Sequence, residues 1–522
     1  MLALAGAVAF PSCSEDWDNH YQVSDQVSQE SMMELLKADP QLSTFAHMVE
    51  IAGYDELLGS SQTFTVFAPT NDALAGVDLE DVEAVKRIVL NHFARFNNTT
   101  ASANGQSVKM YNGKRHSFDG KTFAGISIDP QRSDIIGKNG ILHVLEDQIP
   151  YAYNFREYIQ VHANTSKFNA FLNRFDELQM DLSASRPIGV DENGATVYDS
   201  VLIEYNPILQ HPWYGVGDIA DEDSTFTMII PDDTAWEKAY NRIRPYYDNY
   251  NDDQAVADSI ADVQTGLAIV QDLVFRQLLP NATGEKYLET TTGSEIYDPA
   301  GHFMYCTQTP ASNGIMYLTS NLNYDNVATW NKMLETECER QDNRKPGAQT
   351  TIYNRSVSAD NVMFDSISES SYIEVVNNRA SAQPSVVFTI PQVLACEYDI
   401  YVYVVPGIVT DTLNIESTRL QFTLRYMDTD GKKKSVSFKD DDFLTSPTEY
   451  KCIKVTKDAP FKFPVANYYD MLWLLDPSHN SNNRVFTTEF TIQTNVSNTE
   501  YNKNELVRKF RLDRILFVPI KK

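Results

Sequence analysis

A strand-forming motif occurs twice in this 522-residue chain, and the duplication constrains the fold more than any other feature. Residues 63–74 (TFTVFAPTNDAL) align without gaps on residues 225–236 (TFTMIIPDDTAW) and share two Thr, Phe, Pro and Ala. Each copy is followed at a similar distance by a second motif, NGILHVL from Asn139 and NGIMYL from Asn313, with Tyr317 where the first copy has His143. Two ordered, collinear matches indicate an internal duplication.

Local patterns predict the same elements in both copies. Residues 63–69 are expected to form a short buried strand that Pro69 ends, after which Thr70 or Asn71 can cap a new helix. Apolar residues recur at helical spacing over 31–58 and 81–96, and in the second copy near 266–279. A turn at each Asn-Gly pair is expected to lead into another buried strand.

These motifs resemble the fasciclin domain. The resemblance lies in the strand ending TVFAPTNDA, the Asn91-His92 pair that closes a helix, and the final NGILHV strand. It covers 31–152 closely and 153–337 as a divergent copy that lacks the histidines. The resemblance implies an α/β wedge of short strands packed on helices, used for adhesion and protein association without catalysis.

The last third of the chain has a different pattern. From about residue 340, apolar and polar residues alternate, as in the run with Ile400, Val402 and Val404 on one face. This alternation predicts an antiparallel β-sandwich over 356–522, with a hairpin tip at residues 428–431 and a linker over 338–355. Its strand pattern resembles carbohydrate-binding jelly rolls. The predicted fold is therefore α+β and multidomain.

The N-terminal residues, 1–30, resemble a bacterial lipoprotein signal and tether. A short apolar run precedes Cys13, and Ser14-Glu15-Asp16 follows it. In such proteins the cysteine is acylated, and an acidic pair after it resembles the surface-export signal of Bacteroidetes lipoproteins. We therefore expect an outer-membrane lipoprotein exposed at the cell surface. The alternative is an ordinary frayed terminus with a free thiol.

The net charge of −28 argues against nucleic-acid partners, because such a field repels phosphate backbones. The sequence contains no P-loop, no nucleophile elbow and no zinc-ligand spacing. His92 and His143 lie on apolar motif segments, which is typical of hydrogen-bonded structural histidines; metal binding or acid–base work is the alternative. The chain is predicted not to be an enzyme and to need no cofactor.

Two groups of residues are candidate ligand sites. Asp428 and Asp430 can ligate Ca²⁺ at the hairpin tip, or can be solvated acids of a turn. Exposed aromatic faces stack on sugars, although most aromatic residues are buried in cores. The aromatic candidates are Tyr468, Tyr469, Trp473, Trp213 and Tyr214.

Together these features predict a surface lipoprotein that mediates protein association. In a Bacteroidetes setting, the resemblance implies an accessory subunit of a nutrient importer, beside a TonB-dependent transporter and its SusD-like lipoprotein. The alternative is a surface carbohydrate-binding protein that captures glycans with its C-terminal sandwich.

Overall fold

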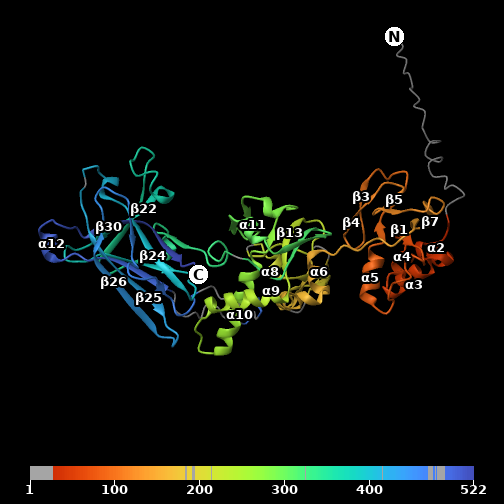
Figure 1. Cartoon of the computed structure of the whole chain (residues 1–522), viewed down its shortest axis with the longest axis horizontal. Helices are drawn as coiled ribbons and strands as arrows, with labels where there is room; N and C mark the ends of the chain where they lie inside the picture. The colour runs from red at the N-terminus through yellow and green to blue at the C-terminus, as the bar shows by residue number, and fades with distance from the viewer. Residues whose placement is uncertain are drawn as a thin grey trace, which may run out of the picture. The chain divides into compact units, whose positions relative to one another are not determined.

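The computed structural model describes residues 28–182, 185–190, 194–212, 214–323, 325–413, 415–467, 474–475, 478 and 488–521 (Figure 1). The chain divides into two compact units. The first runs to Asn154 and also takes in Ala220–Ser224 and Pro310–Asn313. The second contains Phe155–Ile219, Thr225–Thr309 and Gly314–Lys522. We call residues 31–152 the first repeat and residues 153–337 the second repeat.

Helices of the first repeat form where the sequence predicts them. Ser31 begins the series with a capping box, in which its hydroxyl accepts from the Glu34 N–H and the Glu34 carboxylate accepts from the Ser31 N–H. Phe45, Met48 and Val49 are fully buried, which confirms the predicted apolar stripe. The helices are α2 (Met32–Ala38), η1 (Pro40–Leu42), α3 (Ser43–Ile51), α4 (Asp55–Gly59) and α5 (Val82–Leu90).

Two small sheets complete the first repeat. In the first sheet, ordered β2-β1-β8-β7, the two motif strands β1 and β8 are parallel neighbours. Both are buried along their whole length. Side chains such as Val66 and Val144 join the helices in one core, whereas Phe67 and Leu145 pack with the second sheet in another. The strands of the two sheets are β1 (Phe64–Pro69), β2 (Phe93–Arg95), β7 (Ile135–Gly137) and β8 (Gly140–Leu145), then β3 (Gln106–Lys109), β4 (Arg115–Phe118), β5 (Thr122–Phe123) and β6 (Ile126–Ser127).

The prediction that Thr70 or Asn71 caps a new helix after Pro69 is wrong. Turns, not a helix, follow β1, and the Asn71 carboxamide accepts from the Thr44 N–H at 2.9 Å. It therefore caps the start of α3, a helix that precedes it in sequence. Helix α5 is capped locally by Asp81, whose carboxylate accepts from the Ala84 N–H. The helix ends at Leu90 instead of near 96 because β2 begins at Phe93.

The second repeat has the same sheet topology, in the order β14-β13-β18-β17. Its parallel pair keeps the register of the first: Phe226 lies opposite Gly314, as Phe64 lies opposite Gly140. The topology therefore confirms the duplication. Its elements include α6 (Phe155–Val161), η2 (Ala163–Thr165), α7 (Ser166–Asn173), β13 (Phe226–Pro231), α9 (Asp233–Ile243), α10 (Gln254–Val270), β14 (Val274–Phe275), α11 (Pro299–His302), β17 (Cys306–Ala311) and β18 (Gly314–Thr319).

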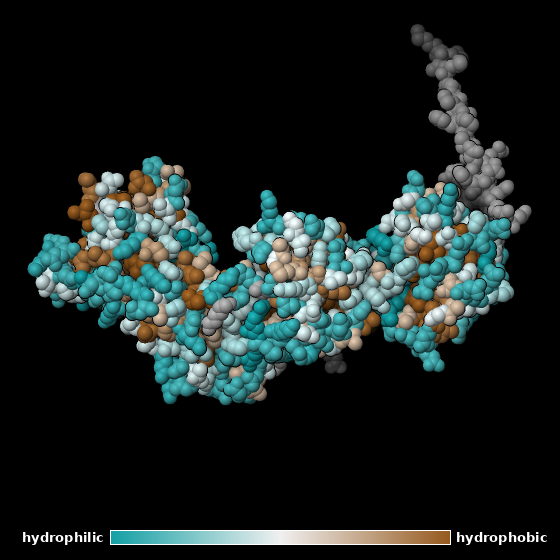
Figure 2. Space-filling model, in the orientation of Figure 1, coloured by the Kyte–Doolittle hydropathy of each residue, from teal (hydrophilic) through white to brown (hydrophobic). Residues whose placement is uncertain are grey.

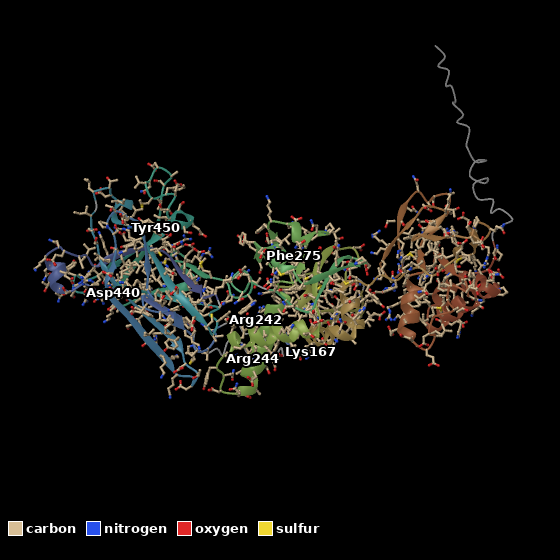
Figure 3. All side chains as sticks on the ribbon, viewed as in Figure 1. Lys167, Arg242, Arg244, Phe275, Asp440 and Tyr450 are labelled. Carbon is tan, nitrogen blue, oxygen red and sulfur yellow. The ribbon has the colours of Figure 1, made fainter. Side chains whose placement is uncertain are left out.

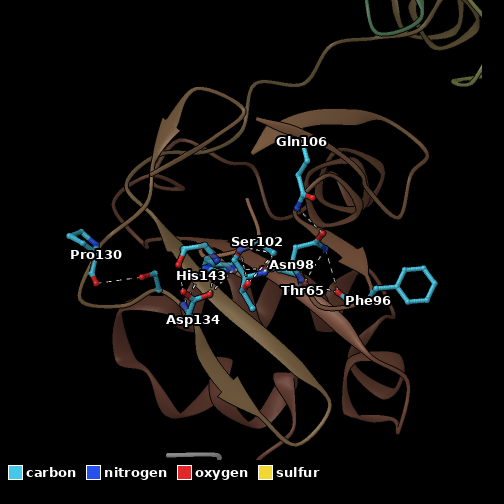
Figure 4. Close-up of polar contacts among 11 residues, drawn as sticks. Thr65, Phe96, Asn98, Ser102, Gln106, Pro130, Asp134 and His143 are labelled. Carbon is cyan, nitrogen blue, oxygen red and sulfur yellow. Dashed lines mark hydrogen bonds and ion pairs between the residues drawn. The ribbon is translucent and has the colours of Figure 1, made fainter. Parts of the chain in front are cut away.

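One threonine ties each motif strand to the loop beside it. The Thr65 hydroxyl donates to the Phe96 carbonyl at 2.7 Å and accepts from the Asn98 N–H at 2.8 Å (Figure 4). In the second repeat, the Thr227 hydroxyl donates to the Gln277 carbonyl at 2.7 Å and accepts from the Leu279 N–H at 2.9 Å. We call this pair of bonds the threonine bridge.

The helix predicted at 266–279 is displaced toward the N-terminus. It is α10, which begins after Asp253 and ends at Val270, because the next residues turn into β14. Around these helices, Lys167 pairs with Glu237, and Arg244 pairs with Asp258 at 3.1 Å. Lys167 and Arg244 are labelled in Figure 3. On β14, Phe275 packs at 5.5 Å, ring centre to ring centre, against Phe303 after α11.

The C-terminal region consists of two antiparallel sheets whose buried faces meet, as at Phe490 and Phe517, with ring centres 5.8 Å apart. The predicted linker at 338–355 is wrong, because β20 and β21 lie there and pair within the sheets. One sheet holds β19 (Leu334–Glu337), β21 (Thr350–Ser356), β22 (Ser371–Asn377), β24 (Glu397–Val404), β27 (Lys451–Lys454), β28 (Phe461–Lys462) and β30 (Lys509–Pro519); the other holds β20 (Arg344–Pro346), β23 (Ser385–Ile390), β25 (Arg419–Met427), β26 (Lys433–Leu444) and β29 (Thr488–Thr494).

Hydrophilic residues predominate on the face of the molecule shown in Figure 2, in keeping with the strongly acidic composition. Among the described residues, none of the helices combines the length and the apolar character needed to cross a membrane.

Candidate interaction surfaces

The two motif histidines are enclosed and hydrogen-bonded. His92 is fully buried: Nδ1 lies 2.7 Å from the Ile88 carbonyl, and Nε2 accepts from the Ile149 N–H. His143 Nε2 donates to the Asn98 carbonyl at 2.9 Å, and Nδ1 accepts from the Asp134 N–H. Burial lowers the pKa of His92 to about 4 and lowers that of His143. Both therefore have the bonding of neutral structural residues.

Tyr317 takes the position of His143 in the second repeat and likewise bonds to main-chain groups of the neighbouring loop. Its hydroxyl donates to the Leu279 carbonyl at 2.6 Å and accepts from the Ala282 N–H at 3.3 Å. Leu279 and Asn98 hold the same place in the two threonine bridges. The second repeat therefore keeps the polar tie at this position with a different side chain.

The aspartates of the predicted calcium site lie at the hairpin tip between β25 and β26. Asp430 accepts from the Lys432 ammonium at 2.8 Å, and Lys434 lies 3.5 Å from Asp428. A Cβ on Gly431 would lie 2.2 Å from Tyr250 Cζ, so the tip packs closely on that ring. Within the described residues, no three His, Cys, Asp or Glu side chains are grouped to hold a metal ion. Calcium binding here stays a prediction that requires the lysines to be displaced.

Of the aromatic candidates, the structure describes Tyr214. Its ring stacks on His211, with centroids 3.7 Å apart, so one face is covered. Burial raises the pKa of Tyr214 to about 12. Trp213, Tyr468, Tyr469 and Trp473 lie outside the described residues, as does Cys13, and their proposed roles stay predictions.

Among the described residues, the largest group of exposed apolar side chains lies in a segment that the sequence analysis missed. Residues 177–205, which we call the arm, form two β-ribbons inserted between α7 and β13. In one, β9 (Glu177–Met180) pairs with β12 (Leu202–Tyr205); in the other, β10 (Arg186–Val190) pairs with β11 (Thr196–Asp199). Large exposed apolar side chains along it are Leu178, Met180, Leu182, Ile188, Val190, Val197, Val201, Leu202 and Ile203.

The base of the arm is clamped to the second repeat. The buried Asn206 carboxamide donates to the Leu172 carbonyl at 2.9 Å and to the Asp176 carboxylate at 2.7 Å. Arg156, also buried, donates to the same carboxylate at 2.6 Å. Asp176 and Asn206 flank the arm in sequence, so these bonds hold its two ends together. The ends of the arm are thus fixed to the second repeat, while its apolar side chains remain exposed to water.

The spacing of the elements before β13 indicates an insertion at the arm. The interval from the start of α6 to β13, residues 155–226, is more than twice the matching interval 32–64 of the first repeat. The helices α6, η2 and α7 keep the spacing of α2, η1 and α3, so the extra residues must lie after α7. Alternation within 177–205 then indicates strands.

Comparisons with known proteins place one family in the chain. Residues 40–149 match the fasciclin domain model. Human Periostin is 28% identical over 137 residues, which cover 23% of this chain and 16% of Periostin. The chain therefore spans about a sixth of that relative's length.

Two solved structures show weaker likenesses. The FAS1 domain pair of the insect cell adhesion molecule Fasciclin I covers 55% of this chain and 98% of its own, at 11% identity and a TM-score of 0.20. A xylan-binding domain from CBM 22 covers 35% and 92%, at 11% identity and a TM-score of 0.21. At these TM-scores neither likeness bears on function.

Proposed function

We propose that this chain, which carries a fasciclin domain at residues 40–149, is a non-enzymatic protein that mediates protein association and docks through the arm. The observation that carries the proposal is the exposure of Ile188 (67%) and Val190 (71%) on the arm, whose two ends are clamped by Asn206 and Asp176. A two-stranded ribbon is marginally stable alone in water, and contiguous exposed apolar residues mark interaction sites.

The arm's chemistry selects a protein partner with an apolar groove and a basic rim. Within the described residues each ribbon has two strands, so the outer edge of each strand can add to a sheet of another protein. It carries six carboxylates against one cation, Arg186. Two copies of the arm would repel each other, so self-pairing is disfavoured, and complementary positive charge on the partner speeds association.

The setting we propose is the outer membrane. Acylated Cys13 would hold the chain at the cell surface and raise its effective concentration near a TonB-dependent transporter and its SusD-like lipoprotein. Association as an accessory subunit of that importer accounts for an anchored, acidic chain that presents a docking arm.

The test is affinity purification of the tagged full chain from its native membrane, with and without two acidic substitutions on the arm. Ile188→Glu with Val197→Glu should reduce recovery of the transporter and SusD-like lipoprotein about tenfold, because each buried charge costs more than 1 kcal/mol. Leu413→Glu with Ile415→Glu is the matched control, since these exposed apolar residues lie elsewhere. Equal recovery with all three proteins contradicts docking by the arm.

The second candidate function is glycan capture, which a polar cavity of about 350 Å³ in the second unit favours. Trp330, Gln271, Gln392 and Tyr398 are among its lining residues, and the buried Trp330 indole N–H has no acceptor within the described residues. Hydroxyl-rich ligands supply such acceptors.

Calorimetry of the full chain against a glycan panel tests this second candidate. Trp330→Phe keeps the ring and removes the donor, while Trp473→Ala removes an aromatic candidate of the sandwich. Loss of binding with either variant supports glycan capture at that residue. Absence of heat with every glycan rejects the function.

A further inference from the structure

A second surface, on the first repeat, has a charge opposite to that of the whole chain. A cavity of about 370 Å³ lies where the ends of β2 and β3 meet, joined by a single bridge between Ala94 and Met110. Its lining includes the cations Arg95, Lys109 and Arg115, and the aromatic residues Phe96 and Tyr111. We call this the basic pocket. Three cations gathered in a chain of net charge −28 are a marked local reversal.

Arg95 is available to bind an anion. Its guanidinium lies 5.3 Å from the centre of the Tyr111 ring, a cation–π contact, and it forms no ion pair with any carboxylate among the described residues. A guanidinium held against an aromatic face presents its remaining N–H groups in a fixed plane that matches a carboxylate.

Phe96 adds an apolar anchor beside that cation. Its side chain is 75% exposed and its φ is +68°, a conformation that bulky residues rarely adopt. Both of its main-chain polar groups are tied down: the N–H donates to the Thr63 carbonyl, and the carbonyl accepts from Thr65. Figure 4 shows the ring pointing away from these bonds. A strained residue that presents an aromatic ring to solvent is a feature of binding sites.

The hairpin formed by β3 and β4 already binds acidic side chains within the first unit. Asp223 lies 2.5 Å from the Lys109 ammonium and 3.1 Å from the Arg115 guanidinium, while Glu222 lies 2.6 Å from Lys114. Asp223 is half exposed, whereas the Lys114 pair is buried. An acidic chain segment therefore occupies one end of the basic surface, and the Arg95 end is open.

We propose that the basic pocket binds an acidic, extended peptide segment of a partner protein. One carboxylate pairs with Arg95, a second competes with Asp223 for Lys109 and Arg115, and an apolar side chain packs on Phe96. A peptide is favoured over an anionic glycan because the pocket places the exposed apolar ring of Phe96 beside its cations, and a peptide supplies both carboxylates and apolar side chains. The pocket is separate from the arm, so either proposal can fail alone.

Fluorescence anisotropy on the full chain tests the proposal. The probe is a fluorescein-labelled decapeptide that alternates glutamate and phenylalanine, and the comparison probe replaces glutamate with lysine. Binding of the acidic probe should weaken steeply between about 20 mM and 200 mM salt, as screening requires. Arg95→Ala should weaken it about tenfold, and Phe96→Ala should weaken it without changing the salt dependence.

Two further variants make the test specific. Asp223→Asn should strengthen binding about threefold, because it releases Lys109 and Arg115 from their internal partner. Lys121→Ala removes an exposed cation outside the pocket and should leave binding unchanged. Equal affinity of wild type and Arg95→Ala, or weaker binding with Asp223→Asn, overturns the proposal. So does binding of oligogalacturonate in preference to the peptide, which would assign the pocket to a glycan.

Discussion

The two repeats are held by the same long-range hydrogen bonds, but only the second has an inserted arm. Asn71 caps α3 from across the fold, and Asp233 does the same for α7 by accepting from the Lys167 N–H at 2.8 Å. Thr65 and Thr227 form equivalent bridges. The first repeat continues from α3 to β1 through the short helix α4, whereas the second places the arm in that interval.

This difference separates the bonds that hold the fold from the arm, which we propose docks on a partner. The ties connect elements far apart in sequence, so a new segment between two tied elements leaves them intact. The insertion begins after α7, and Asp176 and Asn206 clamp it closed before β13. A duplicated domain can thus gain a docking element at little cost to its own core.

The largest predicted effect is at the glycine that begins each second-motif strand. A Cβ on Gly140 would lie 1.9 Å from the Phe64 carbonyl oxygen, and one on Gly314 would lie 1.9 Å from that of Phe226. Gly140→Ala and Gly314→Ala should each lower the free energy of unfolding of their repeat by about 4 kcal/mol or more. Urea denaturation followed by circular dichroism and tryptophan fluorescence measures both, in a background with Trp17→Phe and Trp473→Phe, where the remaining tryptophans lie in the second repeat.

Gly53→Ala is the control for the glycine variants. Its φ is +76°, but nothing lies within 4 Å of an added Cβ, so only backbone strain of about 1 kcal/mol is expected. A Gly140→Ala loss as small as that of Gly53→Ala would show that the close approach of the motif strands is not what holds the sheet.

The second prediction is that acid destabilises the first repeat more than the second. The folded pKa of His92 is about 4, below its ordinary 6.5, so stability is lost as pH falls through that window, by about 3 kcal/mol at pH 4. In the second repeat, burial likewise lowers the pKa of His302 to about 4. There, however, burial raises the pKa of Asp272 to about 6, so its protonation favours the folded state as pH falls from 6 to 4. The two effects nearly cancel.

Urea denaturation at pH 7.5 and pH 4.5 checks this contrast. Two further histidines of the first repeat add to its loss of stability in acid, because burial also lowers the pKa of His116 to about 4 and lowers that of His143. Asp272→Asn removes the compensating carboxyl, so the second repeat should lose more stability between pH 7.5 and pH 4.5 than it does in the wild type. Equal loss in both repeats of the wild type, or no change with Asp272→Asn, contradicts the assignment.

Local sequence signals predicted the repeated strands because their pattern is strong at short range. Proline ends both β1 and β13, and an Asn-Gly pair begins both β8 and β18. The sequence also predicted alternating burial in β24, where every second residue is buried. These features depend on residues within a few positions of each other, which is the range over which hydrophobic periodicity predicts structure.

Features set by distant partners were not predictable in this way. The cap from Asn71 to α3 and the pairing of β20 with β23 each depend on tertiary contacts, so a helix start and a linker were predicted there instead. The basic pocket combines residues from two sheet edges with an unusual φ at Phe96, which no local pattern encodes. The arm could have been predicted from the sequence, but only by comparing the lengths of the two repeats.

The smallest predicted effect tests whether the threonine bridge holds both repeats equally. Thr65→Val and Thr227→Val keep the side-chain shape but remove both bonds of the bridge from a partly buried site, so each should cost about 2 kcal/mol of unfolding free energy. Thr65→Ser and Thr227→Ser keep the hydroxyl and should cost about 1 kcal/mol or less. Urea denaturation measures all four. Because the bond lengths match within 0.1 Å, the two Val variants should agree within error. A cost confined to the first repeat would mean that the Tyr317 hydroxyl, in place of His143, holds the loop of the second repeat without Thr227.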